Sequence, residues 1–479
     1  MKKTIRLLAA ASLVIGLVAA VAVAGTDFGV DRDNLLRGRS VQLFGVQGPI
    51  PASSTSSVTA AQANADPTSL ATFAQSLSAR VVTSGVAAPV IDMLALWPND
   101  QNPEWLIACN EQVEADPGLQ RINIATGAVQ TIVSGTIFCD AAKRTPWGTI
   151  VFTEENGGGT SGGRVYELID PLNTTNVILD RTTGTFSGGT GASNFAVRPA
   201  LGRLSFEGVG IYPNGVMYYG DEDRPLNGAG GGAYFKFVPS TPRDPGADPI
   251  TSLSESPLAS GSVYGLRLGK RSGNTDYGQG TNTGLGTWIA TTGGSDQDLR
   301  AQTAALKLTG YYRPEDLQID LGALAAGEVR FCGDNTGNEA TDHNWGESIC
   351  ITDGTLAQAA TNAATPEVQF FVIGSSDLAM PDNIAYQPGR GNWILHEDGD
   401  IGATHKNNDL WDCLPDGADM DGVSDGCIRI GTLNDLTANA GEGAEWTGGI
   451  FDATGTRFFV SVQHNVSGHG VVLEVTGWR

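Results

Sequence analysis

Two adjacent carboxylates, Glu154 and Glu155, follow a run of β-branched residues that begins at Thr149. Pro146 and Gly148 mark a turn before this run, so the segment is predicted to be a tight turn followed by a buried strand. Like charges held together at the end of a strand repel each other unless protons or cations lie between them. The segment therefore indicates a site for a hard metal cation.

Further acidic residues stand beside apolar or glycine-rich turns along the chain. Each one alone is better explained as a solvated loop acid, and only their repeated placement favours a shared site. Hard cations such as Ca²⁺ bind about six to eight oxygen atoms, more than one segment supplies. The candidate metal ligands of this kind are Glu154, Glu155, Glu207, Glu222, Glu315, Glu397 with Asp398, and Glu445.

A second acidic segment is the loop of residues 413–427. Asp419, Asp421 and Asp425 have a spacing found in many calcium-binding loops, and they are further candidate metal ligands. The EF-hand pattern itself is not matched, because its first ligand position would fall on Gly417. A calcium loop and a bare acidic turn are equally consistent with this spacing.

The elements that would position these acids are short strands. From about residue 90 onward, strand-like runs recur between turn signals such as Pro213-Asn-Gly215, and several runs are followed by acids. The 64 glycines and the 17% of charged residues also suit a turn-rich protein. This pattern predicts an all-β fold, a β-propeller with six blades as the favoured number, whose loops converge on a central channel. An array of β-sandwiches is the alternative, because the repeat is irregular.

The chain divides into three predicted parts. Residues 1–24 resemble a secretory signal peptide, with a basic start, an apolar run and a small-residue cleavage site. Residues 25–80 are rich in Ser, Ala and Thr in places and are predicted to be a poorly structured, low-complexity segment. Residues 81–479 are the predicted propeller domain. We therefore expect a secreted, periplasmic or cell-surface protein with no membrane span in the mature chain.

The formal net charge is −23 at pH 7. Such a surface repels nucleic acid and anionic membranes, which makes both poor partners. It also repels phosphate and carboxylate substrates, unless bound cations reverse the local field.

Six cysteines in an exported chain favour disulfides. The simplest expectation is local pairing within two short segments, between Cys332 and Cys350 and between Cys413 and Cys427. Cys109 and Cys139 are then either a third disulfide or free thiols, and the sequence leaves both possibilities open.

A series of motifs recurs in a characteristic order over residues 90 to 479. Thr145-Pro-Trp-Gly-Thr149 leads to Glu154-Glu-Asn156, and then follow Phe206-Glu-Gly208, Arg313-Pro-Glu-Asp316, Pro381-Asp-Asn383, Glu445-Trp-Thr-Gly448 and Val462-Gln-His464. This order resembles that of the PhoX-type alkaline phosphatases and their secreted relatives. The resemblance implies a β-propeller with iron and calcium ions in its central channel that hydrolyses small phosphate monoesters.

The resemblance also implies residue roles. Cys139 stands where these phosphatases have an iron-binding cysteine, which adds Fe³⁺ to Ca²⁺ as an expected cofactor and Cys139 to the candidate ligands. Arg313 is a candidate catalytic residue, because a guanidinium group matches phosphate oxygens. Asn156, the last residue of its motif, is the other candidate. A disulfide between Cys109 and Cys139 would prevent Cys139 from binding iron as a thiolate.

Some motifs depart from the family pattern. The family's Cys-Ala-Gly-Gly is here Cys139-Asp-Ala-Ala, and its His-Glu pairs appear without the histidine, as in Phe206-Glu207. These changes favour a divergent branch of the family. Two hypotheses for the function follow. The first is a secreted metal-dependent phosphatase with a carboxylate metal cluster in the central channel. The alternative is a non-catalytic extracellular propeller, stabilised by calcium, that acts as a binding or structural protein.

Overall fold

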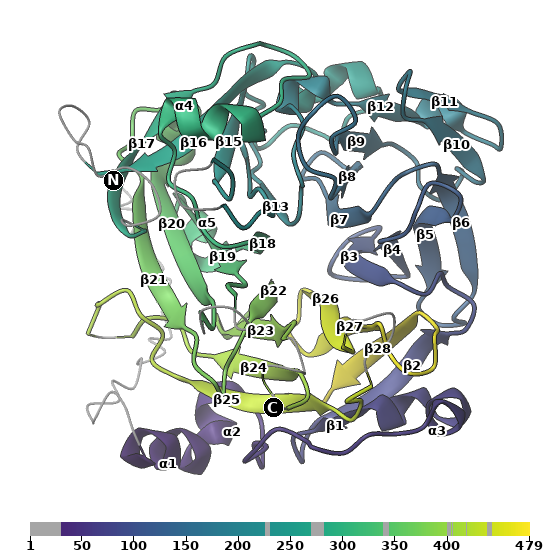
Figure 1. The fold of residues 1–479 in the computed structure, drawn as a ribbon, viewed down its shortest axis with the longest axis vertical. Coiled ribbons are helices and arrows are strands. Elements are labelled where there is room, and N and C mark those ends of the chain that lie inside the picture. Colours follow the sequence, from purple (N-terminus) through teal and green to yellow (C-terminus); the bar gives the residue numbers. More distant parts are fainter. Residues whose placement is uncertain are drawn as a thin grey trace, which may run out of the picture.

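The structure, a computed structural model, describes residues 30–225, 230–269, 282–338, 344–399, 404, 406–417, 419–437 and 443–479. The predicted signal peptide, residues 1–24, lies outside the described residues. Strands predominate in the described part, and they form five hydrogen-bonded sheets arranged around a common centre (Figure 1). This arrangement confirms the all-β, propeller-like prediction.

Most strands of each sheet are consecutive along the chain. The first contains β3 (Ile91–Trp97), β4 (Trp105–Asn110), β5 (Pro117–Asn123) and β6 (Val129–Ser134), extended by β10 (Val177–Asp180) and β11 (Thr185–Ser187). The second contains β7 (Cys139–Arg144), β8 (Ile150–Glu154), β9 (Val165–Leu168) and β12 (Phe195–Val197).

The third sheet has nine strands. One half contains β13 (Val209–Ile211), β14 (Met217–Tyr219), β15 (Phe235–Pro239), β16 (Gly261–Leu268) and β17 (Gly284–Ala290). The other half contains β18 (Pro314–Ile319), β19 (Glu328–Asn335), β20 (Glu347–Thr355) and β21 (Glu367–Ile373). The halves join where β17 pairs with β21.

The last two sheets combine strands from both ends of the chain. One contains β22 (Pro381–Tyr386), β23 (Trp393–Glu397), β24 (Asp409–Cys413) and β25 (Cys427–Leu433), with β1 (Ala71–Phe73) at its edge. The other contains β26 (Glu445–Phe451), β27 (Arg457–Gln463) and β28 (Val471–Thr476), completed by β2 (Ser78–Ser84). The pairing of β2 with β28, from Ser78 opposite Thr476 to Ser84 opposite Val471, closes the ring.

Six strands surround the centre. Each contacts the next in the cyclic order β3, β7, β13, β18, β22, β26 and back to β3. The nine-stranded sheet supplies two of them, β13 and β18, so five hydrogen-bonded sheets present six innermost strands. Apolar side chains fill the spaces between neighbouring sheets, as with Ile107 of the first sheet and Phe152 of the second.

Residues 30–80 contain short helices, the strand β1 and the first residues of β2, and they are not a free spacer. The helices α1 (Val30–Gly38), α2 (Ser40–Phe44) and α3 (Ala60–Ala65) are short. Leu36, Phe44 and Leu70 are nevertheless buried in the hydrophobic cluster of the last two sheets. The segment therefore packs on the outside of the ring, where its strand β1 pairs with β25 (Figure 1). The other short helices are α4 (Thr303–Leu306), α5 (Leu321–Ala325) and α7 (Leu356–Ala359).

Three disulfides are present. The two predicted local pairs, Cys332–Cys350 and Cys413–Cys427, are confirmed, and each joins neighbouring strands of one sheet. The third disulfide joins Cys109 on β4 to Cys139 on β7 and so connects two sheets. Among the described residues, no helix has the length and apolar character needed to cross a membrane.

Candidate metal centre

Six hairpins share one pairing register, which brings acidic residues to one end of the ring. In each of them, the beginning of the innermost strand pairs with the end of the second strand. The pairs are Ile91 with Asn110, Cys139 with Glu154, Val209 with Tyr219, Pro314 with Asn335, Pro381 with Glu397, and Glu445 with Gln463. Residues that begin one strand and residues that follow the other therefore meet at one mouth of the central channel.

Bulges place an acid at the beginning of four of these innermost strands. In the strands β3, β7, β18 and β22, the register shifts directly after the first pair. The second residue of each of these strands is acidic: Asp92, Asp140, Glu315 and Asp382. A bulge redirects side chains that regular pairing would alternate between the faces of the sheet. The bulges therefore form part of the site.

The chain enters three of these strands through a left-handed residue. Phe138 (φ 45°), Arg313 (φ 54°) and Met380 (φ 54°) stand two positions before Asp140, Glu315 and Asp382. Such a conformation costs a residue other than glycine about 1–3 kcal/mol and persists where the surrounding structure enforces it. This repeated strain lies at the acidic mouth.

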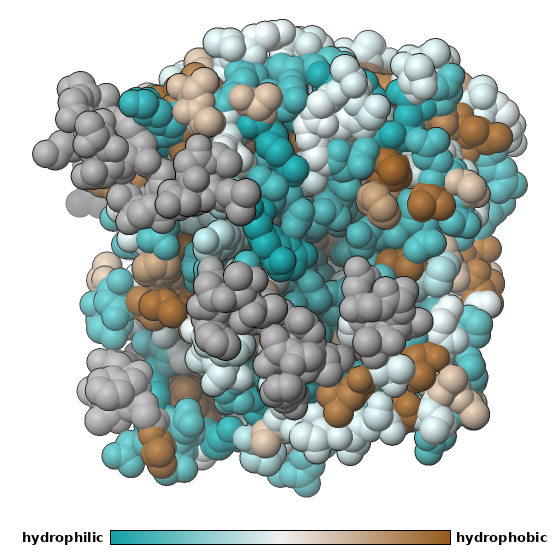
Figure 2. All heavy atoms as spheres, viewed as in Figure 1, coloured by the Kyte–Doolittle hydropathy of each residue, from teal (hydrophilic) through white to brown (hydrophobic). Residues whose placement is uncertain are grey.

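A cavity of about 750 Å³ occupies this mouth. Figure 2 shows hydrophilic residues around the hollow at the centre of the face in view. The acidic residues that line the cavity are Asp92, Glu111, Glu155, Glu207, Glu222, Asp223, Asp382, Asp398 and Glu445. Arg224, Arg313 and His464 also line it.

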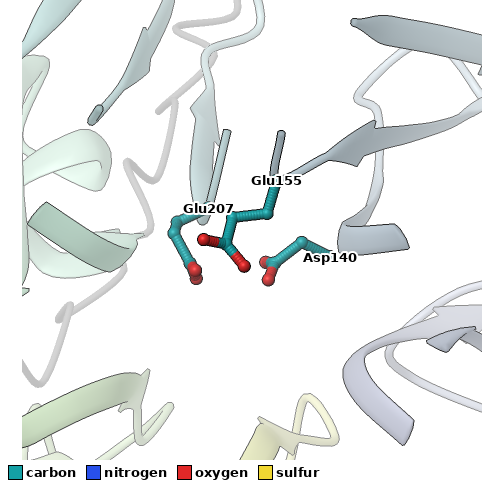
Figure 3. A group of neighbouring side chains, drawn as sticks. All are labelled: Asp140, Glu155 and Glu207. Carbon is teal, nitrogen blue, oxygen red and sulfur yellow. The ribbon is translucent and has the colours of Figure 1, made fainter. Parts of the chain in front are cut away.

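Seven carboxylates form a continuous cluster, which we call the channel cluster. Asp140, Glu155 and Glu207 point toward one another (Figure 3), with ligand atoms within 4.8 Å of each other. Two further groups meet the same distance limit: Glu207 with Glu315 and Asp382, and Asp382 with Asp398 and Glu445. Because Glu207 and Asp382 each belong to two groups, the three groups are linked across the channel.

The channel cluster is electrostatically unstable without bound protons or cations. Burial raises the pKa of Asp140 well above its usual range, and the carboxylates of Asp92 and Glu111 raise it further. Both side-chain oxygens of Asp140 are buried without a hydrogen-bond partner among the described residues. Burial also raises the pKa of Glu315 to about 8, although Arg313 opposes the shift. Oxygen atoms in this condition fit a cation such as Ca²⁺.

Arg313 is a cation at the centre of this acidic mouth. Its Nε lies 2.6 Å from Oε1 of Glu222 and 2.8 Å from Oε1 of Glu315, and its Nη1 lies 3.6 Å from Oδ2 of Asp398. These carboxylates raise the pKa of Arg313 even though burial opposes its charge. The guanidinium is therefore held charged and oriented in the cavity.

Glu154 was predicted as a ligand, but its carboxylate is used inside the protein. It accepts hydrogen bonds from Arg181 Nε at 2.8 Å, the hydroxyl of Tyr166 at 3.0 Å and the backbone N–H of Ile137 at 3.1 Å. Side chains alternate between the two faces of a strand, so consecutive residues point in opposite directions. Only Glu155 of this adjacent pair reaches the cavity.

Glu397 was also predicted as a metal ligand, and its carboxylate is likewise used inside the protein. Its carboxylate accepts hydrogen bonds from the backbone N–H groups of Ala379 and Asp409, at 2.8 and 2.9 Å, and it pairs with Lys406. The following residue, Asp398, lines the cavity instead.

The prediction of Cys139 as an iron ligand is wrong in this structure. Its sulfur is bonded to that of Cys109, and a disulfide sulfur has no thiolate to offer a metal. The residue that follows, Asp140, points into the channel cluster (Figure 3).

The other predicted residues divide between the cavity and the surface. Glu207, Glu222, Glu445 and Arg313 line the cavity, and Glu315 lies in the channel cluster. Asn156 is not a lining residue, because its amide donates to the backbone carbonyl of Ser161 at 2.8 Å.

The loop of residues 413–427 forms a separate acidic group. Asp419 and Asp421 come together with Asp416, within the same 4.8 Å limit. Asp425 does not join them, because it pairs with Arg32 of α1 at 3.8 Å. We call Asp416, Asp419 and Asp421 the loop group.

Several acids of the mouth were not among the candidate ligands predicted from the sequence: Asp92, Glu111, Asp140 and Asp382. Most of them share a signal, an acid at the second position of an otherwise largely apolar strand, as in Ile91-Asp-Met-Leu94 and Pro381-Asp-Asn-Ile384. Burying an acid at that position costs folding free energy, unless a bulge turns its side chain toward a polar channel.

Comparison with known proteins agrees with this architecture. The family model described as alkaline phosphatase PhoX matches residues 108–465. The structure of Pseudomonas fluorescens PhoX, in complex with the transition-state analogue vanadate, is similar with a TM-score of 0.62 and 16% identity. That match covers 90% of this chain and 98% of the other.

Other similarities are weaker. The apo form of the soluble aldose sugar dehydrogenase of Escherichia coli matches with a TM-score of 0.41 and 9% identity, over 84% of this chain and 99% of the other. No curated protein matches the sequence. Because the family model spans most of the chain, this protein belongs to the alkaline phosphatase PhoX family.

Proposed function

We propose that this protein is a metal-dependent phosphatase that hydrolyses phosphate monoesters at the channel cluster. The observation behind this proposal is the cluster of seven convergent carboxylates, five of which line the same open cavity as Arg313. Membership of the alkaline phosphatase PhoX family supports the same reaction.

Calcium is the cation that the described residues fit best. Their donor atoms are carboxylate oxygens from several separate hairpins, which suits the six to eight oxygen ligands of Ca²⁺. The argument for iron depended on Cys139, whose sulfur is engaged in a disulfide. Any Fe³⁺ would have to be bound without a thiolate, so we propose calcium as the principal cofactor.

The cavity supplies what an anionic substrate needs. When bound, cations would neutralise the phosphate and stabilise charge on the leaving oxygen. The guanidinium of Arg313 would hold the non-bridging oxygens, because its planar donors match phosphate geometry. Glu222, Glu315 and Asp398 fix that guanidinium in position before the substrate arrives.

The disulfides support a proposed site of action outside the cytoplasm. Disulfides form and persist in oxidising compartments, and three are present here. We therefore propose a secreted, periplasmic or cell-surface phosphatase.

The test is hydrolysis by purified protein of known metal content. Phenyl phosphate and methyl phosphate would be supplied with Ca²⁺, with EGTA, and with Ca²⁺ restored after EGTA. We expect activity that is lost on chelation and recovered with calcium. Element analysis of the same samples would show whether calcium, iron or both are bound.

The alternative, a non-catalytic propeller stabilised by calcium, predicts a different result. Chelation would then lower thermal stability, and calcium-loaded protein would hydrolyse no phosphate ester. That outcome would overturn the proposed phosphatase.

A further inference from the structure

Phe138 has an unusual place in this molecule. Among the described residues that line the acidic cavity, it is the only one with a large apolar side chain. The other described lining residues are carboxylates, two arginines, one histidine, two glutamines, one threonine and two glycines. A half-buried ring in such a wall has no evident role in binding a metal.

Phe138 also makes no contribution to the hydrophobic core. All other phenylalanines in the described part of the chain belong to a hydrophobic cluster or pack against one. Phe73, Phe186 and Phe370, although only partly buried, pack in this way. Core packing therefore does not explain a phenylalanine at position 138.

The backbone at Phe138 argues against a structural reason as well. Its φ of 45° lies in the left-handed region, which bulky residues avoid and which glycine or asparagine adopts more easily. The conformation is enforced from both sides. The N–H of Phe138 donates to the carbonyl of Gln112, and its carbonyl accepts from the N–H of Glu155, both at 2.8 Å. Cys139, the next residue, is tied to Cys109.

We propose that Phe138 determines substrate specificity by packing against the flat leaving group of an aryl phosphate. This inference deepens the proposed function and depends on it. With the phosphate at the channel cluster and Arg313, the ester's alcohol portion would extend along the cavity wall. The ring of Phe138 is the apolar surface that this wall offers, and aromatic rings favour stacked or edge contacts.

The experiment compares two esters that differ in the group Phe138 would contact. We expect Phe138→Asn to lower kcat/KM for phenyl phosphate about threefold to tenfold and to change kcat/KM for methyl phosphate less than twofold. Taking each ratio of variant to unsubstituted protein cancels the intrinsic difference in reactivity between the esters. Phe138→Tyr, which keeps the ring, should restore the preference, and Phe138→Leu should restore it in part.

Stability measurements separate this role from a packing role. Asparagine suits the left-handed backbone, so Phe138→Asn should leave the melting temperature unchanged or raise it. Phe370→Asn is the matched control, because Phe370 is also half-buried but packs against a hydrophobic cluster. It should lower the melting temperature and leave the ratio of the two esters unchanged.

Equal effects of Phe138→Asn on both esters, or no effect on either, would overturn the inference while leaving the phosphatase proposal intact. If the unsubstituted protein hydrolyses neither ester, the proposed function fails. Calorimetric binding of phenylphosphonate and methylphosphonate to calcium-loaded protein would then decide the inference. Preference for phenylphosphonate that disappears in Phe138→Asn supports it, and equal affinity refutes it.

Discussion

The channel cluster and the loop group are both rich in acids, but they are built in opposite ways. The loop group comes from neighbouring positions in one segment, and its Asp419 and Asp421 are exposed. The channel cluster collects buried and partly buried acids from hairpins spread between residues 140 and 445. Water can solvate the first group, whereas burial raises the pKa values of most members of the second. A high density of acids alone is therefore weaker evidence for a metal site than acids held together where burial raises their pKa values.

The strongest test of this contrast is Glu207→Gln, because Glu207 belongs to two of the three carboxylate groups. We expect kcat for phenyl phosphate to fall at least about a thousandfold, since a bound cation stabilises the transition state by several kcal/mol. Initial rates and element analysis would show activity and bound calcium falling together. Activity within tenfold of the unsubstituted protein would place the reaction elsewhere.

Glu154→Gln and Glu155→Gln compare adjacent residues with different surroundings. Glu154→Gln leaves the charge of Arg181 largely buried without its main partner, which costs about 3–5 kcal/mol of unfolding free energy. Glu155→Gln removes a carboxylate whose pKa burial and neighbouring acids raise, so metal-free protein should lose no stability. Urea unfolding in EGTA measures both. Greater destabilisation by Glu155→Gln would contradict the assignment of Glu155 to the cluster.

Asp412→Asn tests how the burial of an acid outside the channel cluster affects stability at different pH values. Burial raises its pKa to about 8, so the folded protein holds a proton that the unfolded chain releases near its ordinary pKa of 3.8. Stability from this group is present at low pH and is lost as pH rises toward 8. Asp412→Asn avoids this loss and can still accept from Asn392. We expect its stability advantage to grow by up to about 4 kcal/mol between pH 5 and pH 8. An advantage that does not change with pH would show that Asp412 is ionised in the folded protein.

Removal of calcium should have a smaller effect on stability. At a free concentration 100 times the dissociation constant, a ligand stabilises the folded state by about 2.7 kcal/mol. We expect EGTA to lower the melting temperature of the unsubstituted protein and to have much less effect on Glu207→Gln. Equal sensitivity of the two proteins would assign the stabilising calcium to another site.

The smallest effect is expected from Asp421→Asn in the loop group. An exposed acid away from a packed site changes stability by less than about 0.5 kcal/mol. Activity and the EGTA-dependent shift in melting temperature should both be unchanged. A large loss of calcium-dependent stability would show that the loop holds a calcium ion after all.

Much of the architecture could be predicted from the sequence. Short strands, turns and strand-end acids indicated the all-β propeller, and close spacing indicated the disulfides Cys332–Cys350 and Cys413–Cys427. Glu155 and Glu207 were also named among the candidates of the cavity. These features depend on local pattern, which the sequence displays directly.

The remainder depended on geometry that local pattern does not reveal. Whether Glu154 or Glu155 reaches the cavity depends on which face of β8 is turned toward the channel. Asp92, Asp140 and Asp382 reach the mouth through bulges, whose positions depend on strand pairing. The pairing of Cys109 with Cys139 depends on how two sheets meet.

The pairing of β2 with β28 has a consequence for the time at which the site can form. Glu445 stands at the beginning of β26, in the sheet that needs a strand from each end of the chain. A growing chain that has not yet reached Thr476 cannot complete that sheet or hold its acid at the mouth. Assembly of the full carboxylate set thus waits until β28 has been synthesised, so a shorter nascent chain presents only a partial metal site.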